Sequence, residues 1–221
     1  MDVCKKMIKV VLFDMDGTIL NTLDDLADSL NHVLEQYGLP THETEKYKHF
    51  VGNGIPVLCE RVMPEDKRSD KALYESIYHD FLEYYGKHSL DKTAPYKGIP
   101  ELAEALRERG LHTAVITNKA QPAADKVLEH FFPNMFDFVI GQISEMPTKP
   151  HPAGTFKALE RLGVTADEAL FIGDSSVDMQ TAKNAGIDSV GVLWGFRDEK
   201  ELRDNGAKYI VSSPEQILDL I

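Results

Sequence analysis

Short apolar runs alternate with helical patterns along most of this chain, and this alternation constrains the fold more than any other feature. The runs are rich in β-branched and aromatic residues, as buried strands are, and they occupy positions 10–13, 112–117, 136–141, 169–173, 188–194 and 208–211. Helical patterns separate most of the runs, and three of these patterns end just before a glycine, namely 101–109, 153–162 and 176–185. Alternating strands and helices predict an α/β fold in which helices cover both faces of a parallel sheet.

One interval, 21–92, breaks this alternation because it contains no strand-like run. Apolar residues recur there at helical spacing over 23–37 and 73–84, which predicts two long helices, the second with a possible N-cap at Ser69. Two shorter helical segments fit between them. The interval therefore reads as a bundle of helices inserted just after the first strand.

These patterns together predict a Rossmann-like parallel sheet core with an inserted helical-bundle cap domain. We expect the catalytic core to comprise residues 1–18 and 93–221, and the cap to comprise residues 19–92. An insertion that leaves and re-enters the core beside the first strand is well placed to act as a lid over the loop that follows this strand.

The composition restricts the class of protein and its partners. Of the 221 residues, 43% are hydrophobic and 27% are charged, which is typical of a folded globular chain that can bury a sizeable core. The formal net charge is −12, and an acidic surface repels phosphate backbones and anionic lipids. We therefore expect neither nucleic acid nor a membrane as a partner, whereas a small anionic substrate is compatible with local cations or a metal.

The N-terminal segment and the cysteines indicate where the protein works. Cys4 and Cys59 are the two cysteines and neither has a CxxC neighbour, which predicts two free thiols rather than a zinc site or a disulfide. The apolar run that follows the N-terminal lysines has four residues, too few for a signal peptide or a membrane span. We expect a cytoplasmic protein that is a monomer or a homodimer.

Polar residues gather where the predicted strands end. In an open parallel sheet, ligands bind at the carboxyl ends of the strands, so these side chains are expected to lie together. They are carboxylates, hydroxyls, an amide and lysines, namely Asp14, Asp16, Thr18, Thr117, Asn118, Lys119, Lys149, Asp174, Ser175 and Asp178.

This set of side chains indicates phosphoryl transfer. Carboxylates that face one cavity repel one another unless a hard cation lies among them, and Mg²⁺ prefers carboxylate oxygens, water and phosphate. Asp14 can then attack phosphorus, while Asp16 protonates the leaving oxygen and later deprotonates water. Lys149 and the hydroxyl of Thr117 would neutralise and orient the phosphoryl oxygens. Gly17 lets backbone N–H groups approach the phosphate.

Four motifs carry a family resemblance. DMDGT, VITN, the lysine of KPHP and GDSSVD resemble, in order and spacing, the four motifs of the haloacid dehalogenase-like phosphatases, and the resemblance extends over nearly the whole chain. It implies that Asp14 is the nucleophile, that Asp16 is the general acid and base, and that Thr117 and Lys149 bind phosphate.

The resemblance also implies the metal site and a substrate. Mg²⁺ would be held by Asp14, the backbone carbonyl of Asp16, and Asp174, with Asp178 nearby. Within the family, FVGNG at 50–54 and LWGFR at 193–197 look most like phosphoglycolate phosphatases, which implies 2-phosphoglycolate as the substrate. We expect four further residues to contact it, two at the strand ends and two in the cap loop, namely Thr18, Asn118, Gly52 and Asn53.

Each motif alone also fits a simpler structural role. The stretch Asp14–Gly17 could be a turn, Asp174 with Ser175 could cap a helix, and Lys149 could be a solvated loop lysine. The same fold also serves other small phosphate esters, such as nucleoside monophosphates, pyrophosphate and sugar phosphates, or a sugar phosphomutase. A dehalogenase has no need of Asp16 as an acid, and a protein that only binds a phosphate ligand would not need the complete set.

Overall fold

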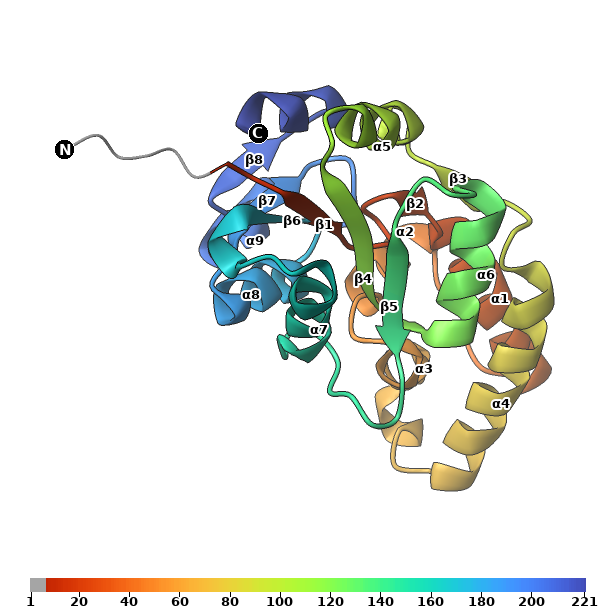
Figure 1. Ribbon diagram of the computed structural model, residues 1–221. Helices are drawn as coiled ribbons and strands as arrows, with labels where there is room; N and C mark the ends of the chain where they lie inside the picture. The colour runs from red at the N-terminus through yellow and green to blue at the C-terminus, as the bar shows by residue number, and fades with distance from the viewer. Residues whose placement is uncertain (1–6) are drawn as a thin grey trace.

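A parallel sheet forms the centre of the larger part of the molecule (Figure 1). The computed structural model describes residues 7–221, and within them the sheet has six strands in the order β5-β4-β1-β6-β7-β8. The strands are β1 (Val10–Phe13), β4 (His112–Ala120), β5 (Phe138–Gln142), β6 (Ala169–Gly173), β7 (Asp188–Val192) and β8 (Tyr209–Val211). All neighbouring pairs in this sheet are parallel, so the α/β prediction is confirmed, and each of the six predicted runs contributes one strand.

Alternate residues of β1 enter two separate layers of core, because successive side chains of a strand point to opposite faces. Val10 and Leu12 pack with α7 (Ala153–Leu162) and α8 (Ser176–Ala185). Their neighbours Val11 and Phe13 pack on the other face with α5 (Ile99–Glu108), α6 (Gln121–Phe131) and the C-terminal 3₁₀ segment Pro214–Leu220. Both faces of β1 are therefore dry, which explains why the strand is apolar at every position.

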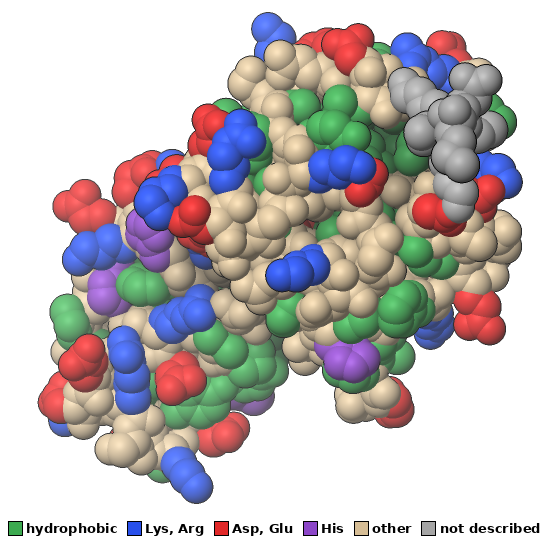
Figure 2. Space-filling view, turned by 90° about the vertical axis from the view of Figure 1, so that its left-hand side faces the viewer, with side chains coloured by type: hydrophobic (Ala, Val, Ile, Leu, Met, Phe, Trp, Pro, Cys, Tyr) green, Lys and Arg blue, Asp and Glu red, His purple; other side chains and the backbone are tan. Residues whose placement is uncertain are grey.

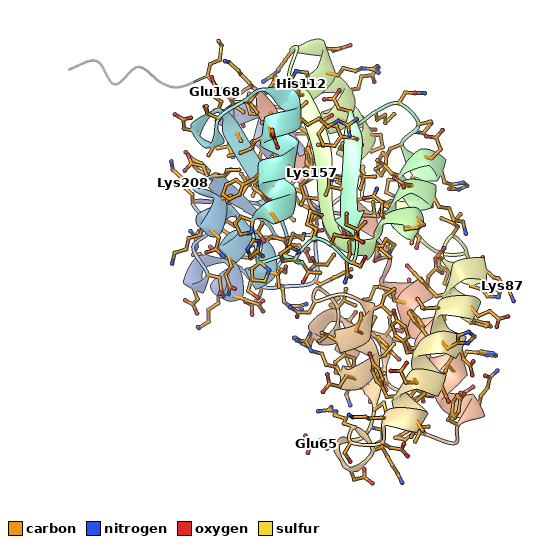
Figure 3. The ribbon with its side chains drawn as sticks, turned by 60° about the horizontal axis from the view of Figure 1, so that its bottom comes forward. Glu65, Lys87, His112, Lys157, Glu168 and Lys208 are labelled. Carbon is orange, nitrogen blue, oxygen red and sulfur yellow. The ribbon has the colours of Figure 1, made fainter. Side chains whose placement is uncertain are left out.

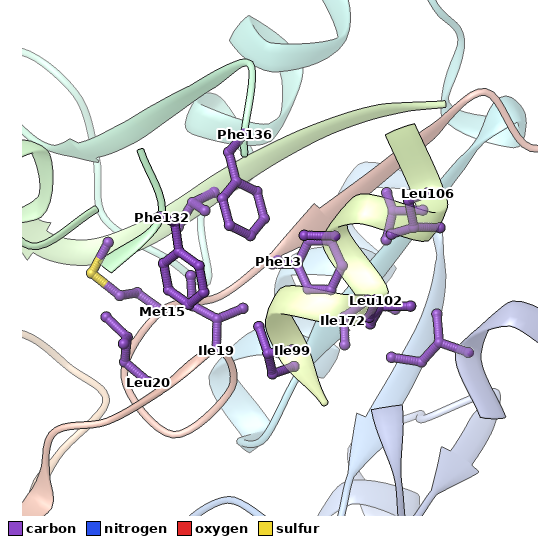
Figure 4. Packing of buried hydrophobic residues seen from close by; sticks show 14 of the residues in the cluster. Phe13, Met15, Ile19, Leu20, Ile99, Leu102, Leu106, Phe132, Phe136 and Ile172 are labelled. Atoms are coloured by element: carbon purple, nitrogen blue, oxygen red, sulfur yellow. The ribbon is translucent and has the colours of Figure 1, made fainter. Parts of the chain in front are cut away.

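Aromatic and aliphatic side chains fill the second of these layers (Figure 4). Phe13 meets Phe136 edge to face at 5.7 Å between ring centroids, and Phe136 meets Phe132 in the same way at 5.4 Å. Met15 and Ile19, which lie in the loop after β1, are fully buried in the same cluster. The loop that carries the acidic residues is thus anchored to the core between Asp14 and Asp16 and again after them.

Four helices occupy the predicted insertion and have a core of their own. They are α1 (Leu23–Gln36), α2 (Thr44–Phe50), α3 (Ile55–Val62) and α4 (Lys71–His88), with a short 3₁₀ turn at Glu65–Lys67. Their apolar faces form a hydrophobic cluster, and within residues 7–221 Phe196 is the one core residue that joins it. Figure 3 shows the insertion at one end of the sheet, with Glu65 at its far tip and Lys87 on α4. The described residues thus include the two long and two short helices that the periodicity predicts.

The two connections to the insertion pair with each other. The two-residue strands β2 (Leu20–Asn21) and β3 (Ala94–Pro95) are antiparallel neighbours, and both are too short for a sequence pattern to reveal. The buried carboxylate of Asp25, on α1, accepts hydrogen bonds from the backbone N–H groups of Lys92 and Thr93 at 2.8–3.1 Å. The exit and the return of the chain are therefore tied together beside the loop after β1.

Some element ends differ from the sequence prediction. The helix α4 is capped by Asp70 rather than Ser69, because the Asp70 carboxylate accepts the Leu73 N–H at 3.1 Å. The helix α5 begins at Ile99, two residues earlier than predicted, after Gly98 in a left-handed conformation with a φ of 90°. The short helix α9 (Glu199–Asp204) falls in a segment for which the sequence predicted no helix.

The surface and the thiols agree with an ordinary globular protein. Figure 2 shows acidic and basic side chains intermixed over one face of the molecule rather than gathered by sign. Across residues 7–221, no helix combines the length and the apolar character needed to cross a membrane. Cys59 is a free, buried thiol, as predicted, whereas Cys4 lies outside the described residues.

Candidate active site

Three neighbouring strands deliver their polar ends to one edge of the sheet. Asp14 follows β1, Thr117 lies near the end of β4 and Asp174 follows β6, and β1 pairs directly with both of the other strands. The backbone N–H of Asp14 still donates to the Ile172 carbonyl at 2.9 Å, so the strand pairing continues to the acidic residue itself. The order of the strands therefore places these side chains side by side.

Three buried carboxylates converge at this edge. One oxygen of each of Asp14, Asp174 and Asp178 lies within 4.8 Å of the other two, and these side chains are almost inaccessible to solvent. Burial and the nearby Asp178 raise the pKa of Asp174 to about 7. The same two causes raise the pKa of Asp14 well above its ordinary value. Like charges at this spacing disfavour ionisation, so the cluster is short of positive charge.

Lys149 supplies part of that charge. Its ammonium lies 2.7 Å from Asp14 Oδ1 and 2.7 Å from Asp178 Oδ1, and only 5% of the side chain is exposed. Burial opposes the charged form of this lysine. The attraction of Asp14 and Asp178 is stronger than this effect, so the pKa of Lys149 lies above its ordinary value. The lysine stays charged and bridges two of the three acids.

Asp178 is already fully engaged within the protein. Its Oδ2 accepts hydrogen bonds from the backbone N–H of Ser175 at 3.1 Å and from the Ser175 hydroxyl at 2.6 Å, and its Oδ1 accepts from Lys149. This is the reciprocal arrangement of a capping box at the start of α8. Ser175 therefore caps a helix, as the sequence suggested, and the acidic site lies at the same place.

Asp174 is held by a close backbone approach. Its Oδ2 accepts the Phe196 N–H at 2.8 Å and its Oδ1 accepts the Thr18 hydroxyl at 3.2 Å. A Cβ atom at either Gly17 or Gly195 would overlap the carboxylate, and Gly17 has a φ of 90°. Both positions need glycine because the chain passes directly against the acid.

A small cavity opens beside the acids and is shared by the core and the insertion. It has a volume of about 40 Å³. The core lines it with Asp14, Asp16, Thr117, Asn118 and Lys119, and the insertion lines it with Leu26, Val51, Gly52, Gly54, Ile55 and Leu58. The wall from the insertion is therefore apolar apart from its backbone, while the wall from the core is charged and polar.

Comparison with known proteins identifies the family. Residues 11–192 match the family model described as haloacid dehalogenase-like hydrolase, which covers most of the chain and all four motifs. The chain belongs to the haloacid dehalogenase-like hydrolases. The resemblance seen in the motifs is thereby confirmed.

Three similar proteins match this chain over almost their whole length. A phosphoglycolate phosphatase from Colwellia psychrerythraea is 32% identical over 215 residues, which cover 95% of each chain. A phosphoglycolate phosphatase from Haemophilus influenzae is 32% identical, with 96% of this chain and 98% of the relative covered. The crystal structure of a protein from Lactobacillus delbrueckii subsp. bulgaricus is 34% identical with a TM-score of 0.92, covering 97% of this chain and 98% of that chain.

Most of the predicted site residues meet at this one place in the hydrolase fold. The cavity is lined by Asp14, Asp16, Thr117, Asn118 and Gly52, and Lys149, which is not part of the wall, contacts Asp14. The Thr117 hydroxyl accepts the Lys119 N–H at 3.2 Å. The predicted catalytic residues and the cap loop therefore lie around the same small cavity.

Two predicted substrate-binding residues point elsewhere. The Thr18 hydroxyl is fully buried and donates to Asp174 rather than lining the cavity. The side-chain oxygen of Asn53 accepts a hydrogen bond from Arg61 at 2.9 Å within the insertion, and Asn53 is absent from the cavity wall. Gly52 and Gly54 on either side of it do line the cavity, so this loop reaches the site through its backbone.

The structure adds a charged pair to which the sequence assigned no role. The ammonium of Lys119 lies 3.0 Å from Asp16 Oδ1 and 3.1 Å from the hydroxyl of Tyr85, which is on α4. Burial opposes the charge on Lys119, but Asp16 outweighs it and raises the pKa of the lysine above its ordinary value. The position of Lys119 at a strand end could have indicated a role in the site, whereas no pattern in the sequence pointed to its partner Tyr85.

Proposed function

We propose that this protein is a magnesium-dependent phosphomonoester hydrolase that acts on 2-phosphoglycolate through an aspartyl-phosphate intermediate. The observation that carries the proposal is the buried Asp14 carboxylate, which lies 2.7 Å from Lys149 in a cluster of three acids at the edge of the sheet. Membership of the haloacid dehalogenase-like hydrolases supports hydrolysis. The names of the relatives from Colwellia psychrerythraea and Haemophilus influenzae support the substrate.

The donor set fits Mg²⁺. Three carboxylates with one lysine between two of them leave an excess of negative charge, and the raised pKa values of Asp14 and Asp174 reflect it. We propose that Asp14, the backbone carbonyl of Asp16, and Asp174 hold the ion, since both carboxylate oxygens of Asp178 are already engaged. When bound, the ion would offset the charge of the acids and polarise a phosphoryl oxygen.

In the first step, Asp14 is the nucleophile. A carboxylate oxygen of Asp14 forms a bond to phosphorus, and the bond from phosphorus to the ester oxygen breaks with its electron pair on that oxygen. Asp16, two residues further along the same loop and on the wall of the same cavity, gives its proton to the departing oxygen. The products of this step are the alcohol and the phosphorylated Asp14.

In the second step, the same two residues hydrolyse the intermediate. Asp16, now a carboxylate, takes a proton from a water molecule as the water oxygen attacks phosphorus. The bond from phosphorus to Asp14 breaks, and inorganic phosphate leaves with the carboxylate of Asp14 restored. Asp16 regains its proton and the cycle closes.

Lys149, Thr117 and Asn118 are proposed to hold the phosphoryl group. The ammonium of Lys149 contacts Asp14 and Asp178 and has a third donor for a phosphoryl oxygen, and Thr117 lines the cavity near the end of β4. Asn118 fixes the Lys149 backbone, because its side-chain oxygen accepts the Lys149 N–H at 2.8 Å and its nitrogen donates to the Lys149 carbonyl at 3.1 Å.

We propose that residues 19–92 act as a cap that selects small substrates. The cavity of about 40 Å³ has room for only a few water-sized groups, and the insertion forms its apolar wall. Two core side chains hold the cap loop, since Asn118 donates to the Gly52 carbonyl at 3.0 Å and Arg197 donates to the Val51 carbonyl at 2.9 Å. A nucleoside or a hexose would have to displace much more of this wall than a two-carbon leaving group would. A cytoplasmic location and a monomeric or homodimeric state stay predictions from the sequence.

A panel of phosphate monoesters tests the proposal. We expect kcat/KM for 2-phosphoglycolate to exceed that for nucleoside monophosphates and hexose phosphates, with Mg²⁺ required and exhaustive chelation abolishing phosphate release. A higher value for a nucleotide or a sugar phosphate would overturn the substrate and leave the phosphatase in place. Transfer of phosphate to a second position of a sugar, without release, would indicate a mutase instead, and binding without turnover would indicate a non-enzymatic protein.

A further inference from the structure

Lys119 occupies a position that the four motifs do not explain. It lies at the end of β4, two residues after Thr117, with only 3% of its side chain exposed. Among the described residues that line the cavity, Lys119 alone is basic, since Lys149 contacts Asp14 but is not part of that wall. A buried cation in the wall of a substrate cavity requires an anion as its partner.

Asp16 and Tyr85 are the hydrogen-bond partners of its ammonium. The ammonium contacts Asp16 Oδ1 at 3.0 Å and Asp16 Oδ2 at 3.3 Å, and it contacts the Tyr85 hydroxyl at 3.1 Å. An ammonium has three N–H donors and these contacts occupy all three, but the contact with Asp16 Oδ2 is the longest and is the one that a substrate carboxylate would replace. Tyr85 is buried on α4, so the lysine is held between the core and the cap.

We propose that Lys119 binds a carboxylate on the leaving group of the substrate and thereby selects acidic phosphate esters. This inference rests on the proposed phosphatase function, and it names the residue that recognises the acid group of the substrate. The other cavity residues are less suited to bind this carboxylate, because the Asn118 nitrogen already donates to the Gly52 and Lys149 carbonyls and Thr117 is assigned to the phosphoryl group. The side chains of the cap wall are aliphatic or absent, and Asp14 and Asp16 are themselves acids.

The separation of the groups suits an acid close to the ester. A general acid works within about 3 Å of the oxygen that it protonates. Lys119 lies 3.0 Å from the Asp16 carboxylate. Only the Asp16 carboxyl group would therefore separate the ammonium from the ester oxygen. In a phosphoglycolate-type ester, one CH₂ separates the ester oxygen from the carboxyl carbon, which places a carboxylate oxygen about 3 Å from the ester oxygen by ordinary bond lengths. An ester without this acid would leave the lysine without its partner from the substrate.

A comparison of two esters of similar size tests the proposal. 2-Phosphoglycolate carries the carboxylate, whereas 2-hydroxyethyl phosphate has an uncharged hydroxymethyl group in its place. With Mg²⁺ present, we expect the wild type to prefer phosphoglycolate in kcat/KM. Replacing the lysine in Lys119→Met should lower that preference on the order of 10- to 100-fold, because a charge-assisted hydrogen bond is lost. The neutral ester should lose much less.

Two further variants make the test specific. Lys119→Gln keeps a donor for Asp16 and Tyr85 but carries no charge, so it should lose the preference as Lys119→Met does. Lys126→Met is the matched control, because Lys126 is an exposed lysine on α6 that donates to the Gly86 carbonyl of α4 at 2.8 Å and does not line the cavity. It removes a lysine contact between the core and the same cap helix, and we expect it to leave the preference unchanged.

The outcomes separate this inference from the proposed function. If the wild type hydrolyses both esters and Lys119→Met lowers kcat/KM equally for both, Lys119 only positions Asp16 and the inference is wrong. If the wild type prefers the neutral ester, the inference is also wrong. This result does not depend on whether any variant folds. If the wild type hydrolyses neither ester, the proposed function fails and the inference fails with it.

Discussion

The side-chain nitrogen of Asn118 donates a hydrogen bond of 3.0 Å to the main-chain carbonyl of Gly52, and this contact joins the end of β4 to the helical insertion. The same amide exchanges two hydrogen bonds with the backbone of Lys149, at 2.8 and 3.1 Å. One buried side chain therefore fixes the segment that carries the lysine and also holds the loop that covers the cavity.

We expect Asn118→Ala to lower kcat/KM on the order of 10- to 100-fold, because loss of these hydrogen bonds leaves buried backbone groups without partners. Asn53→Ala is the matched loss of an amide, since the Asn53 side chain contacts Arg61 within the insertion. It should change the ranking of substrates through the cap loop while the affinity for inorganic phosphate stays close to that of the wild type. Steady-state kinetics and phosphate inhibition measure both effects. Equal losses of phosphate affinity in the two variants would contradict the role given to Asn118.

Asp14→Asn should abolish turnover while the protein stays folded. The amide has almost the same shape as the acid, but it is a far poorer nucleophile, and we expect kcat to fall on the order of 10⁴-fold or more. The variant also removes a buried acid whose pKa is raised by burial and by Asp178, so its thermal midpoint without metal should not fall below that of the wild type at neutral pH. Phosphate release and a thermal melt measure the two results. Activity at the wild-type level would exclude Asp14 as the nucleophile.

The stability of the metal-free protein should depend on the ionisation of Asp174. The pKa of this acid is about 7 in the folded protein and has an ordinary value of 3.8. The folded state therefore keeps a proton that the unfolded chain has released. The resulting stabilisation is fully present below about pH 4 and is lost as the pH rises through about 7.

Asp174→Asn isolates this effect because the amide does not titrate. With a chelator present, we expect the thermal midpoint of the wild type to fall relative to that of Asp174→Asn between about pH 5 and about pH 8. Adding Mg²⁺ at the upper pH should raise the midpoint of the wild type more than that of the variant. Parallel pH profiles for the two proteins would show that Asp174 does not carry the predicted proton.

Gly17→Ala should damage the site itself rather than the fold in general. Gly17 has a φ of 90°, and an added Cβ would overlap the Asp174 carboxylate. Gly38 is the control, because it has a φ of 64° but no atom within 4 Å of the added Cβ. Both variants should lose about 1–2 kcal/mol of stability from the left-handed backbone, but only Gly17→Ala should lose turnover and metal binding. Thermal melts and phosphate release measure the two effects. If Gly38→Ala also lost activity, backbone strain alone would explain the loss in Gly17→Ala.

The sequence by itself determined the sheet, the helical insertion and the position of the acidic site. Apolar runs such as Val10–Phe13 and helical spacing such as that of α1 are local patterns, and each is set by which faces of a few consecutive residues must be buried. The site followed because the carboxyl ends of parallel strands share one edge, so Asp14, Thr117 and Asp174 had to meet.

Only the tertiary structure decided how those side chains are used. Lys119 and Tyr85 are separated by 34 positions, and their contact depends on how α4 docks against the end of β4. In the same way, Asn53 turns to Arg61 and Thr18 turns to Asp174, because each polar group bonds to the partner that the folded chain brings within reach. Periodicity and motif spacing report what is adjacent along the chain, whereas hydrogen bonds and charge pairs between distant segments are fixed only when those segments pack together.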